Sequence, residues 1–409
     1  MRFLGCKVSL ADAALIRDAL IDAGHVEAPR EEAEVQVVNT CALTQEAERK
    51  SRQGANRAAR AGRTFVTGCA ANLNALQFQG AEAVRGSADR AAAEIVERLG
   101  PGPRHACAED APRPAFGRTR AFLKVQNGCD ASCAFCIIPT TRGRAGSRPM
   151  TRILADARRR VADGQPEVVL TGINIGTYRD PASGAGLAGL VRALDRMDEG
   201  IERIRISSIE PGSLTDGLLD AIAASEVAGP HLHVPLQSGD SRVLARMRRG
   251  YSAGDYLDAC TRARAALPAL NLTTDAIVGF PGEDEAAFAN TMAAVEEAGI
   301  SKVHVFPYSP RPGTAAAGQR GAVADDVRAE RAARLRDLSD RQGFAHRSGR
   351  VGSEDRVLVE RVHEDGTCSG LGADYTRFVV PGALARAGDL LAVRATGTAG
   401  DHVVGEMRR

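Results

Sequence analysis

Three of the nine cysteines lie within eight residues, in the run Cys129-Asp-Ala-Ser-Cys133-Ala-Phe-Cys136. Three thiolates on one short loop can ligate three irons of a [4Fe–4S] cluster and leave the fourth iron open to a ligand. A structural zinc ion normally takes four protein ligands, so the run fits zinc poorly, although His231 or His233 could complete such a site. A chance group of buried thiols is the remaining interpretation. The spacing favours the cluster.

A second set of three cysteines is dispersed in sequence but shares one local context. Cys6, Cys41 and Cys69 each follow a predicted strand, in RFLGC, VQVVNTC and TFVTGC. The carboxyl ends of parallel strands meet at one edge of a sheet, where ligands bind. Three independent buried thiols would also fit, because free cysteine is often buried. The repeated position favours a second [4Fe–4S] cluster.

Alternating strand and helix patterns must position both sets. Residues 1–110 predict a parallel α/β sheet domain, which ends in a Pro- and Gly-rich linker over residues 100–114. The predicted strands are Arg2–Gly5, Glu34–Val38 and Thr64–Gly68, and the predicted helices are Ala11–Ala23 and Gln45–Ala61.

Residues 115–346 carry a longer alternation, which predicts a partial (β/α)6 barrel of the TIM type, with a doubly wound sheet as the alternative. A charged amphipathic helix over 323–346 would close it. Residues 347–409 predict a small all-β barrel. The predicted barrel strands are Ala121–Val125, Glu167–Leu170, Arg203–Ser207, His231–Val234, Asn271–Ile277 and Lys302–Phe306.

Composition sets the broad class. The chain has 409 residues, 44% hydrophobic and 25% charged, which excludes a disordered chain and a coiled-coil rod. No apolar run approaches the ~20 residues that span a bilayer, and the first residues lack a signal-peptide pattern. We therefore expect a cytoplasmic protein without a membrane partner. Cys107 in the linker, Cys260 in a helix and Cys368 in a turn fall outside both sets and are interpreted as incidental.

Basic residues gather beside the compact cysteine run. Residues 118–160 hold ten Arg or Lys against two acids, although the chain is Arg-rich throughout. A cationic surface of this kind can hold phosphates. Arg142, Arg144 and Arg148 are the predicted RNA contacts.

The quoted segments resemble a known family. The C-x3-C-x2-C run with Phe135 before its last Cys resembles the radical S-adenosylmethionine (SAM) signature, and QNGCDASCAFCIIPTTRGRAGSR and HVFPYSPRPGTAAA resemble the core of the methylthiotransferases. GCKVSLADAALI, NTCALTQEAERKSRQ and TGCAA resemble the N-terminal domain of that family. GADYTRFVVPG is similar to a TRAM domain, a small RNA-binding barrel.

The resemblance implies an activity. SAM would bind the open iron held by Cys129, Cys133 and Cys136, while Phe135, Gly172, Glu210 and Gln237 would contact SAM. Cys6, Cys41 and Cys69 would hold an auxiliary cluster that carries sulfur. A radical would remove hydrogen from C2 of a modified adenine in the tRNA anticodon loop, and a methylthio group would transfer there. An electron donor and a sulfur source are implied partners.

Several details resemble the branch that acts on N6-threonylcarbamoyladenosine at position 37 of tRNA, although Ser9 stands where that branch usually has Asn. The alternatives are the same chemistry on isopentenyladenosine in tRNA or on an aspartate of a ribosomal protein. A non-enzymatic iron–sulfur RNA-binding protein is the distant alternative.

Overall fold

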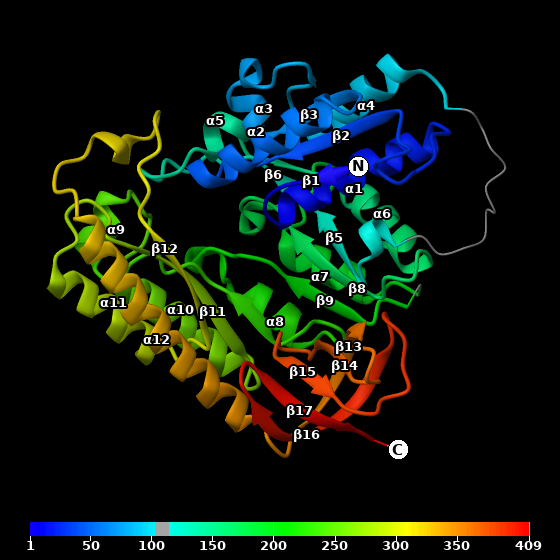
Figure 1. The fold of residues 1–409 in the computed structure, drawn as a ribbon. Helices are drawn as coiled ribbons and strands as arrows, with labels where there is room; N and C mark the ends of the chain where they lie inside the picture. The colour runs from blue at the N-terminus through cyan, green and yellow to red at the C-terminus, as the bar shows by residue number, and fades with distance from the viewer. Residues whose placement is uncertain (103–113, 199, 409) are drawn as a thin grey trace.

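A computed structural model describes residues 1–102, 114–198 and 200–408 (Figure 1). Its N-terminal part is a parallel sheet in the order β1-β2-β3-β4. Alternate residues of the central strands face opposite sides: Val37 and Phe65 pack with α1 and α4, whereas Val38 and Val66 pack with α2. The elements are β1 (Arg2–Phe3), α1 (Lys7–Asp22), β2 (Val35–Thr40), α2 (Gln45–Ala59), β3 (Arg63–Gly68), α3 (Cys69–Leu73), β4 (Glu82–Ala83) and α4 (Ala88–Leu99).

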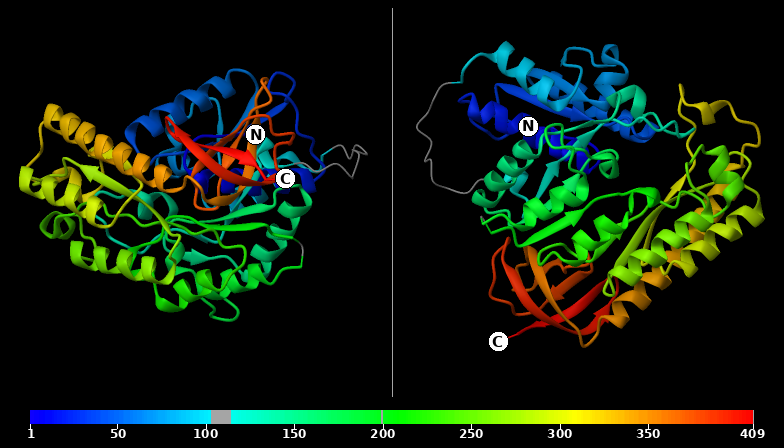
Figure 2. Two further views of the ribbon diagram at one scale, coloured as in Figure 1. Left: turned by 90° about the horizontal axis from the view of Figure 1, so that it is seen from below. Right: turned by 180° about the vertical axis from the view of Figure 1, so that it is seen from behind.

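The central part is the expected partial barrel. Parallel strands form two sheets, β5-β8-β9 and β10-β11-β12, and parallel bridges at Ile204–Ala228 and Ser208–His233 join them. Helices cover the outside of this open half-barrel (Figure 2). The strands are β5 (Arg120–Lys124), β8 (Glu167–Thr171), β9 (Arg203–Ile206), β10 (His231–His233), β11 (Asn271–Val278) and β12 (Lys302–Pro307). The helices are α6 (Met150–Ala162), α7 (Leu187–Asp195), α8 (Asp216–Ala223), α9 (Ser241–Arg246), α10 (Ala253–Ala266), α11 (Glu285–Glu297) and α12 (Asp325–Gly349).

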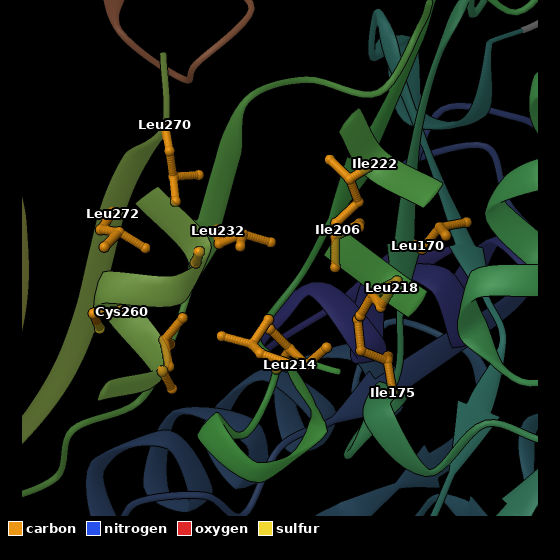
Figure 3. Packing of buried hydrophobic residues seen from close by; sticks show 14 of the residues in the cluster. Leu170, Ile175, Ile206, Leu214, Leu218, Ile222, Leu232, Cys260, Leu270 and Leu272 are labelled. Atoms are coloured by element: carbon orange, nitrogen blue, oxygen red, sulfur yellow. The ribbon is translucent and has the colours of Figure 1, made fainter. Parts of the chain in front are cut away.

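The largest core lies between the barrel strands and these helices. Ile206, Leu232 and Leu272 alternate with polar residues along their strands, and with Leu170 they contribute to this core (Figure 3). Cys260 of α10 belongs to this core, as its predicted helical position allows. The intervening residues face the inside of the barrel, so polar chemistry is confined to the concave side.

The C-terminal part is a closed five-stranded barrel in the order β13-β14-β15-β17-β16. Its strands are β13 (Glu354–Val362), β14 (Cys368–Leu371), β15 (Arg377–Val380), β16 (Leu390–Ala399) and β17 (His402–Met407). Inside the half-barrel, Glu167 is fully buried between Arg203 and Arg205. Arg205 also donates to the carbonyl oxygens of Gly372 and Ala373, at 2.8 and 2.9 Å, which docks the small barrel on the large one.

The structure corrects one sequence expectation about the small barrel. Cys368 was expected in a turn, but it begins β14 and is buried in the module core, since a single Gly-containing turn precedes it. Cys107 and most of the expected linker lie outside the described residues. Among the described residues, no helix is both long and apolar enough to cross a membrane.

Candidate cofactor site with two sets of three cysteines

The compact cysteine run lies on a loop at the carboxyl end of β5. The short antiparallel pair β6 (Gln126–Asn127) and β7 (Gly146–Ser147) closes the loop at its base. The Cys129 amide donates to the Gly143 carbonyl oxygen at 3.1 Å, and the Ala134 amide donates to that of Met247 at 2.8 Å. Helix α5 (Ile138–Arg142) follows the last cysteine. Backbone bonds therefore hold the loop against the barrel mouth.

Each thiol of this radical-type set, Cys129, Cys133 and Cys136, accepts a hydrogen bond. The donors are the Ala131 amide to Cys129 Sγ at 3.4 Å, the Ile138 amide to Cys136 Sγ at 3.4 Å and Arg249 Nη1 to Cys133 Sγ at 3.2 Å. Burial raises the pKa of Cys136 to about 11; the Ile138 amide opposes the rise, and the neighbouring Cys133 and Cys129 thiolates add to it. Each sulfur of the set therefore already has a polar neighbour on or beside the loop.

The dispersed set is brought together by the sheet, as the strand-end pattern predicts. Cys6 is the N-cap of α1, Cys41 directly follows β2, and Cys69 directly follows β3 and begins α3. Glycine is required beside two of them. A Cβ on Gly5 would lie 2.8 Å from Cys41 Cβ, and a Cβ on Gly68 would lie 2.2 Å from Asn39 Oδ1. Both glycines also have positive φ.

The thiols of this auxiliary set, Cys6, Cys41 and Cys69, also have polar neighbours. Arg142 Nε donates to Cys69 Sγ at 3.0 Å, and the Leu43 amide donates to Cys41 Sγ at 3.5 Å. Burial raises the pKa of Cys41 to about 11, while the Leu43 amide opposes the rise and the Cys6 and Cys69 thiolates add to it. The Ser9 hydroxyl lies 3.9 Å from Cys6 Sγ, so the residue that departs from the family pattern still contacts this thiol.

Arg142 joins the two sets. Besides Cys69 it donates to Asp12 Oδ2 at 2.9 Å and to Asn127 Oδ1 at 2.8 Å, and Asn127 lies two residues before Cys129. Burial opposes ionisation of Asp12, but its ion pairs with Lys124 and Arg142 outweigh this and lower the pKa of the carboxyl group. The two sets are therefore adjacent, because the arginine that follows the radical-type set hydrogen-bonds a sulfur of the other.

One buried nitrogen on Arg142 has no partner among the described residues: Nη2. It belongs to the guanidinium that contacts Cys69. An acceptor at the auxiliary set would satisfy it, and the sulfide and thiolate sulfurs of an iron–sulfur cluster are acceptors of this kind. The donor set and this unpartnered N–H both fit such a cluster.

The predicted SAM-contacting residues lie around the barrel mouth. Glu210 forms an ion pair with Arg249, which itself contacts Cys133, and burial raises the pKa of Glu210 despite that cation. Gln237 adopts a left-handed φ of 63°, a conformation that clusters at functional sites. Phe135 packs edge-on to Phe280, and Gly172 lies in the turn after β8.

The three predicted RNA-binding arginines have different environments. Arg144 is exposed and lies 3.3 Å from Asp130. Arg148 is mostly buried and pairs with Asp156 at 2.6 Å. Arg142 is buried against the thiol and carboxylate described above. Arg144 is the most exposed of the three, whereas carboxylates hold Arg142 and Arg148; a role in RNA binding stays a prediction for each of them.

Sequence reasoning missed several polar residues of the site. Asp12 lies in an otherwise apolar stretch of α1, which is itself a signal of a buried charge. Gln126 is buried, and its Oε1 accepts the amides of Ile173 and Asn174 at 3.0 and 2.9 Å, which fixes the turn after β8. Arg249 gave no signal, because one more arginine is inconspicuous in this chain.

The structure does not support a zinc ion held by the compact cysteine run and a histidine. Among the described residues, one group of His, Cys, Asp or Glu side chains has its ligand atoms close enough together to hold a single ion. This group is His233, Asp275 and His304, and it includes no cysteine. The two histidines considered as a fourth ligand bond Thr273 instead.

A half-barrel with three cysteines on the loop after its first strand is the architecture of radical SAM enzymes. The radical SAM superfamily profile matches residues 123–295, and the profile described as Uncharacterized protein family UPF0004 matches residues 1–85. Superfamily membership implies a [4Fe–4S] cluster and SAM. The structure of the radical S-adenosylmethionine methyltransferase TsrM from Kitasatospora setae shares the fold, with a TM-score of 0.55 and 13% identity over 77% of this chain and 73% of that one.

Curated relatives define the family more closely. The Threonylcarbamoyladenosine tRNA methylthiotransferase MtaB of Chlamydia pneumoniae is 38% identical over 88% of this chain and 86% of its own length. The Bacillus subtilis protein of the same name is 39% identical, over 82% and 79%. A tRNA-2-methylthio-N(6)-dimethylallyladenosine synthase of Parafrankia sp. is 35% identical, over 88% and 77%. The chain belongs to the radical SAM methylthiotransferase family and is an enzyme of that class.

Proposed function

We propose that the chain transfers a methylthio group to C2 of N6-threonylcarbamoyladenosine at position 37 of tRNA, giving 2-methylthio-N6-threonylcarbamoyladenosine. The observation that carries the proposal is the adjacency of two three-thiol sets, joined by Arg142. The relatives named for this substrate support it, since three of them match 82% or more of this chain.

The two sets of cysteines would have different chemical roles. Cys129, Cys133 and Cys136 would hold the cluster that binds SAM, and Cys6, Cys41 and Cys69 would hold a second cluster that carries sulfur. When bound, the first cluster and SAM supply a carbon-centred radical that can remove hydrogen from an unactivated C–H bond. An electron donor and a sulfur source are then required as partners.

The chain's own residues position these groups. Arg249 and Arg142 each donate to one ligand sulfur and neutralise a nearby carboxylate, Glu210 or Asp12. Second-layer hydrogen bonds of this kind orient ligands and set the properties of a metal site. The turn fixed by Gln126, together with Phe135, Glu210 and Gln237, would form the SAM pocket at the barrel mouth.

A groove between the barrels supports RNA binding. A cavity of about 360 Å³ lies between residues 117–122 and the small C-terminal barrel. Arg118 and Arg361 line it, and neither guanidinium has an ion-pair partner in the part of the chain that the structure describes. We propose that residues 347–409 act as an RNA-binding TRAM domain through this groove, with Arg144 as a further phosphate contact.

The test is anaerobic reconstitution followed by reaction with three tRNAs that differ only in adenosine 37: threonylcarbamoylated, isopentenylated or unmodified. About eight irons per chain and a methylthiolated nucleoside from the first tRNA are expected. Product from the isopentenylated tRNA alone would show that the chain belongs to the branch that acts on isopentenyladenosine. Absence of both 5′-deoxyadenosine and product on every tRNA would favour a non-enzymatic iron–sulfur protein.

A further inference from the structure

A polar recess lies where the three parts of the molecule meet, beside the auxiliary set. Its volume is about 270 Å³, close to the lower end of small-molecule sites, which is about 300 Å³. Lys7 contributes from the N-terminal part, His231, His233 and His304 from barrel strands, and Tyr375 from the small barrel. No residue in this group takes part in cluster ligation.

Lys7 is an unpaired cation in this recess. It directly follows Cys6, its side chain is exposed to the cavity, and its Nζ lies 5.4 Å from the centre of the Tyr375 ring. Within the described residues, no carboxylate forms an ion pair with it and no acceptor hydrogen-bonds it. Tyr375 is held in a left-handed conformation, with φ of 69°, which places its ring against Lys7 and His231. The arrangement leaves a positive charge available to an anionic group.

His231, which lines the same recess, has a buried nitrogen without a partner among the described residues. Its side chain is buried, with 7% of the residue exposed, and Nδ1 has no hydrogen-bond partner among the described residues. Its Nε2 lies 3.0 Å from the Thr273 hydroxyl, which in turn lies 2.9 Å from His233 Nδ1. His233 Nε2 lies 3.2 Å from Asp275 Oδ1.

These contacts set the hydrogen-bonding character of His231. When His233 is neutral, the Nε2–H of His233 donates to Asp275. The other ring nitrogen of His233, Nδ1, then accepts a hydrogen bond from the Thr273 hydroxyl group. The Thr273 oxygen is then free to accept from His231 Nε2–H. His231 Nδ1 is therefore left as an acceptor, suited to a ligand O–H or N–H.

The geometry points to a subsite for the substituent on N6 of the substrate adenosine: we propose that Lys7 pairs with its carboxylate and that His231 Nδ1 accepts a hydrogen bond from its hydroxyl group. This inference rests on the proposed function. A threonylcarbamoyl group carries both a carboxylate and a hydroxyl. An isopentenyl group carries neither, and it would leave Lys7 and His231 unsatisfied.

The position of the recess suits this role. In adenine only N1 separates C2 from C6, the atom that carries N6, so a base presented to the clusters through C2 keeps its N6 substituent close by. Lys7 lies next to a ligand of the auxiliary set. Lys7 therefore places the recess beside the auxiliary set.

The experiment measures binding of labelled anticodon stem-loop RNAs to the reconstituted enzyme, with threonylcarbamoyladenosine, isopentenyladenosine or adenosine at the target position. The ratio of Kd values between RNAs is the readout, so a general loss of RNA affinity does not affect it. The variants are Lys7→Gln, Lys7→Arg and His231→Gln. Lys50→Gln is the matched control, because Lys50 is an exposed lysine of the same part of the chain.

Wild type is expected to prefer the threonylcarbamoylated RNA, and Lys7→Gln to reduce that preference about tenfold, the effect of one charge-assisted hydrogen bond. Lys7→Arg should restore most of it. His231→Gln keeps a polar group near Thr273 but removes Nδ1, and should reduce the preference about threefold. Lys50→Gln should leave the ratio unchanged.

The outcomes separate this inference from the function beneath it. If wild type methylthiolates and prefers threonylcarbamoylated RNA while Lys7→Gln keeps the full preference, the subsite is wrong and the function stands. If wild type prefers isopentenylated RNA or binds all three RNAs equally, both are overturned. Iron content is measured for every variant, and a Lys7→Gln protein with less iron than Lys7→Arg would assign Lys7 to cluster stability instead.

Discussion

The sulfurs of the two cysteine sets have similar polar surroundings, but the fold brings the cysteines of each set together in a different way. The radical-type set lies on one loop, and its cysteines are brought together by eight residues of chain and by the pairing of β6 with β7. The auxiliary set comes from three strand ends up to 63 residues apart (69 − 6), and the parallel sheet brings it together. The first depends on local sequence, whereas the second requires the N-terminal part to fold.

In both sets an arginine donates to one cysteine sulfur and pairs with a buried or half-buried carboxylate. Arg249 joins Cys133 to Glu210, and Arg142 joins Cys69 to Asp12. Arg142 also belongs to the helix that follows the radical-type set. Each set therefore has a positively charged side chain beside one of its sulfurs, whether the cysteines come from one loop or from three strand ends. The two arginines are matched positions at which each set can be tested separately.

The largest expected effect is the loss of one cluster at a time, when all three cysteines of one set are replaced. Replacing Cys129, Cys133 and Cys136 together with Ala should reduce iron from about eight to about four per chain and abolish SAM cleavage, because no ligand of that cluster remains. Replacing Cys6, Cys41 and Cys69 should cause the same loss of iron but keep SAM cleavage while methylthio transfer disappears. Iron and sulfide analysis with 5′-deoxyadenosine measurement checks both. A first variant without any iron would refute an independent auxiliary site.

A second contrast uses two glycines with similar backbones. Gly68 has φ 91° and ψ −166°, and Gly143 has φ 72° and ψ −162°. An Ala at either costs roughly 1–3 kcal/mol of strain. At Gly68 its Cβ would also clash with Asn39 and Thr40, whereas at Gly143 no atom lies within 4 Å.

Gly68→Ala is therefore expected to lower auxiliary iron occupancy by more than half, because the clash moves Cys69. Gly143→Ala should lower the free energy of unfolding by the strain alone and retain both clusters. Iron content and denaturant unfolding curves of the two variants test this. Equal iron loss in both would show that strain, not the clash, controls cluster assembly.

The arginine pair should give smaller and more selective effects. Arg249→Gln removes a donor from Cys133 and should reduce SAM cleavage about tenfold, whereas Arg142→Gln should reduce methylthio transfer about tenfold with SAM cleavage largely kept. Electron paramagnetic resonance of the reduced proteins should show the changed cluster in each. A change of the same cluster signal in both variants would contradict the separate assignments.

The smallest contrast concerns pH, since the two sets should respond alike. Burial raises the pKa of Cys41 and of Cys136 to about 11, so both thiols are protonated at neutral pH and ligation must release those protons. Iron uptake by the apo-protein should therefore increase from pH 7 to pH 9, with about tenfold more thiolate per unit. Uptake rates in the two triple variants measure each set alone, and a pH dependence in only one would show that the sets differ.

Much of the fold was predictable because its periodicity is local. All six barrel strands and the long helix α12 lie within a few residues of their predicted positions, since the outward-facing apolar residues alternate along each strand. The start of β14 was missed, because Cys368 follows a Gly-containing turn and precedes the small residues Ser369 and Gly370. Gly370 belongs to β14 and would not tolerate a side chain, with Leu358 O only 2.0 Å from a built Cβ.

The residues of the site were also predictable only in part. The sequence by itself determined the six cysteines, because spacing and strand-end position are properties of the chain. Only the tertiary structure decided the contacts of Arg142, Arg249 and Lys7, since each depends on a partner or cavity formed by residues far away in sequence. An arginine near a cluster motif can bind a phosphate or a sulfur, and long-range packing around its guanidinium selects between them.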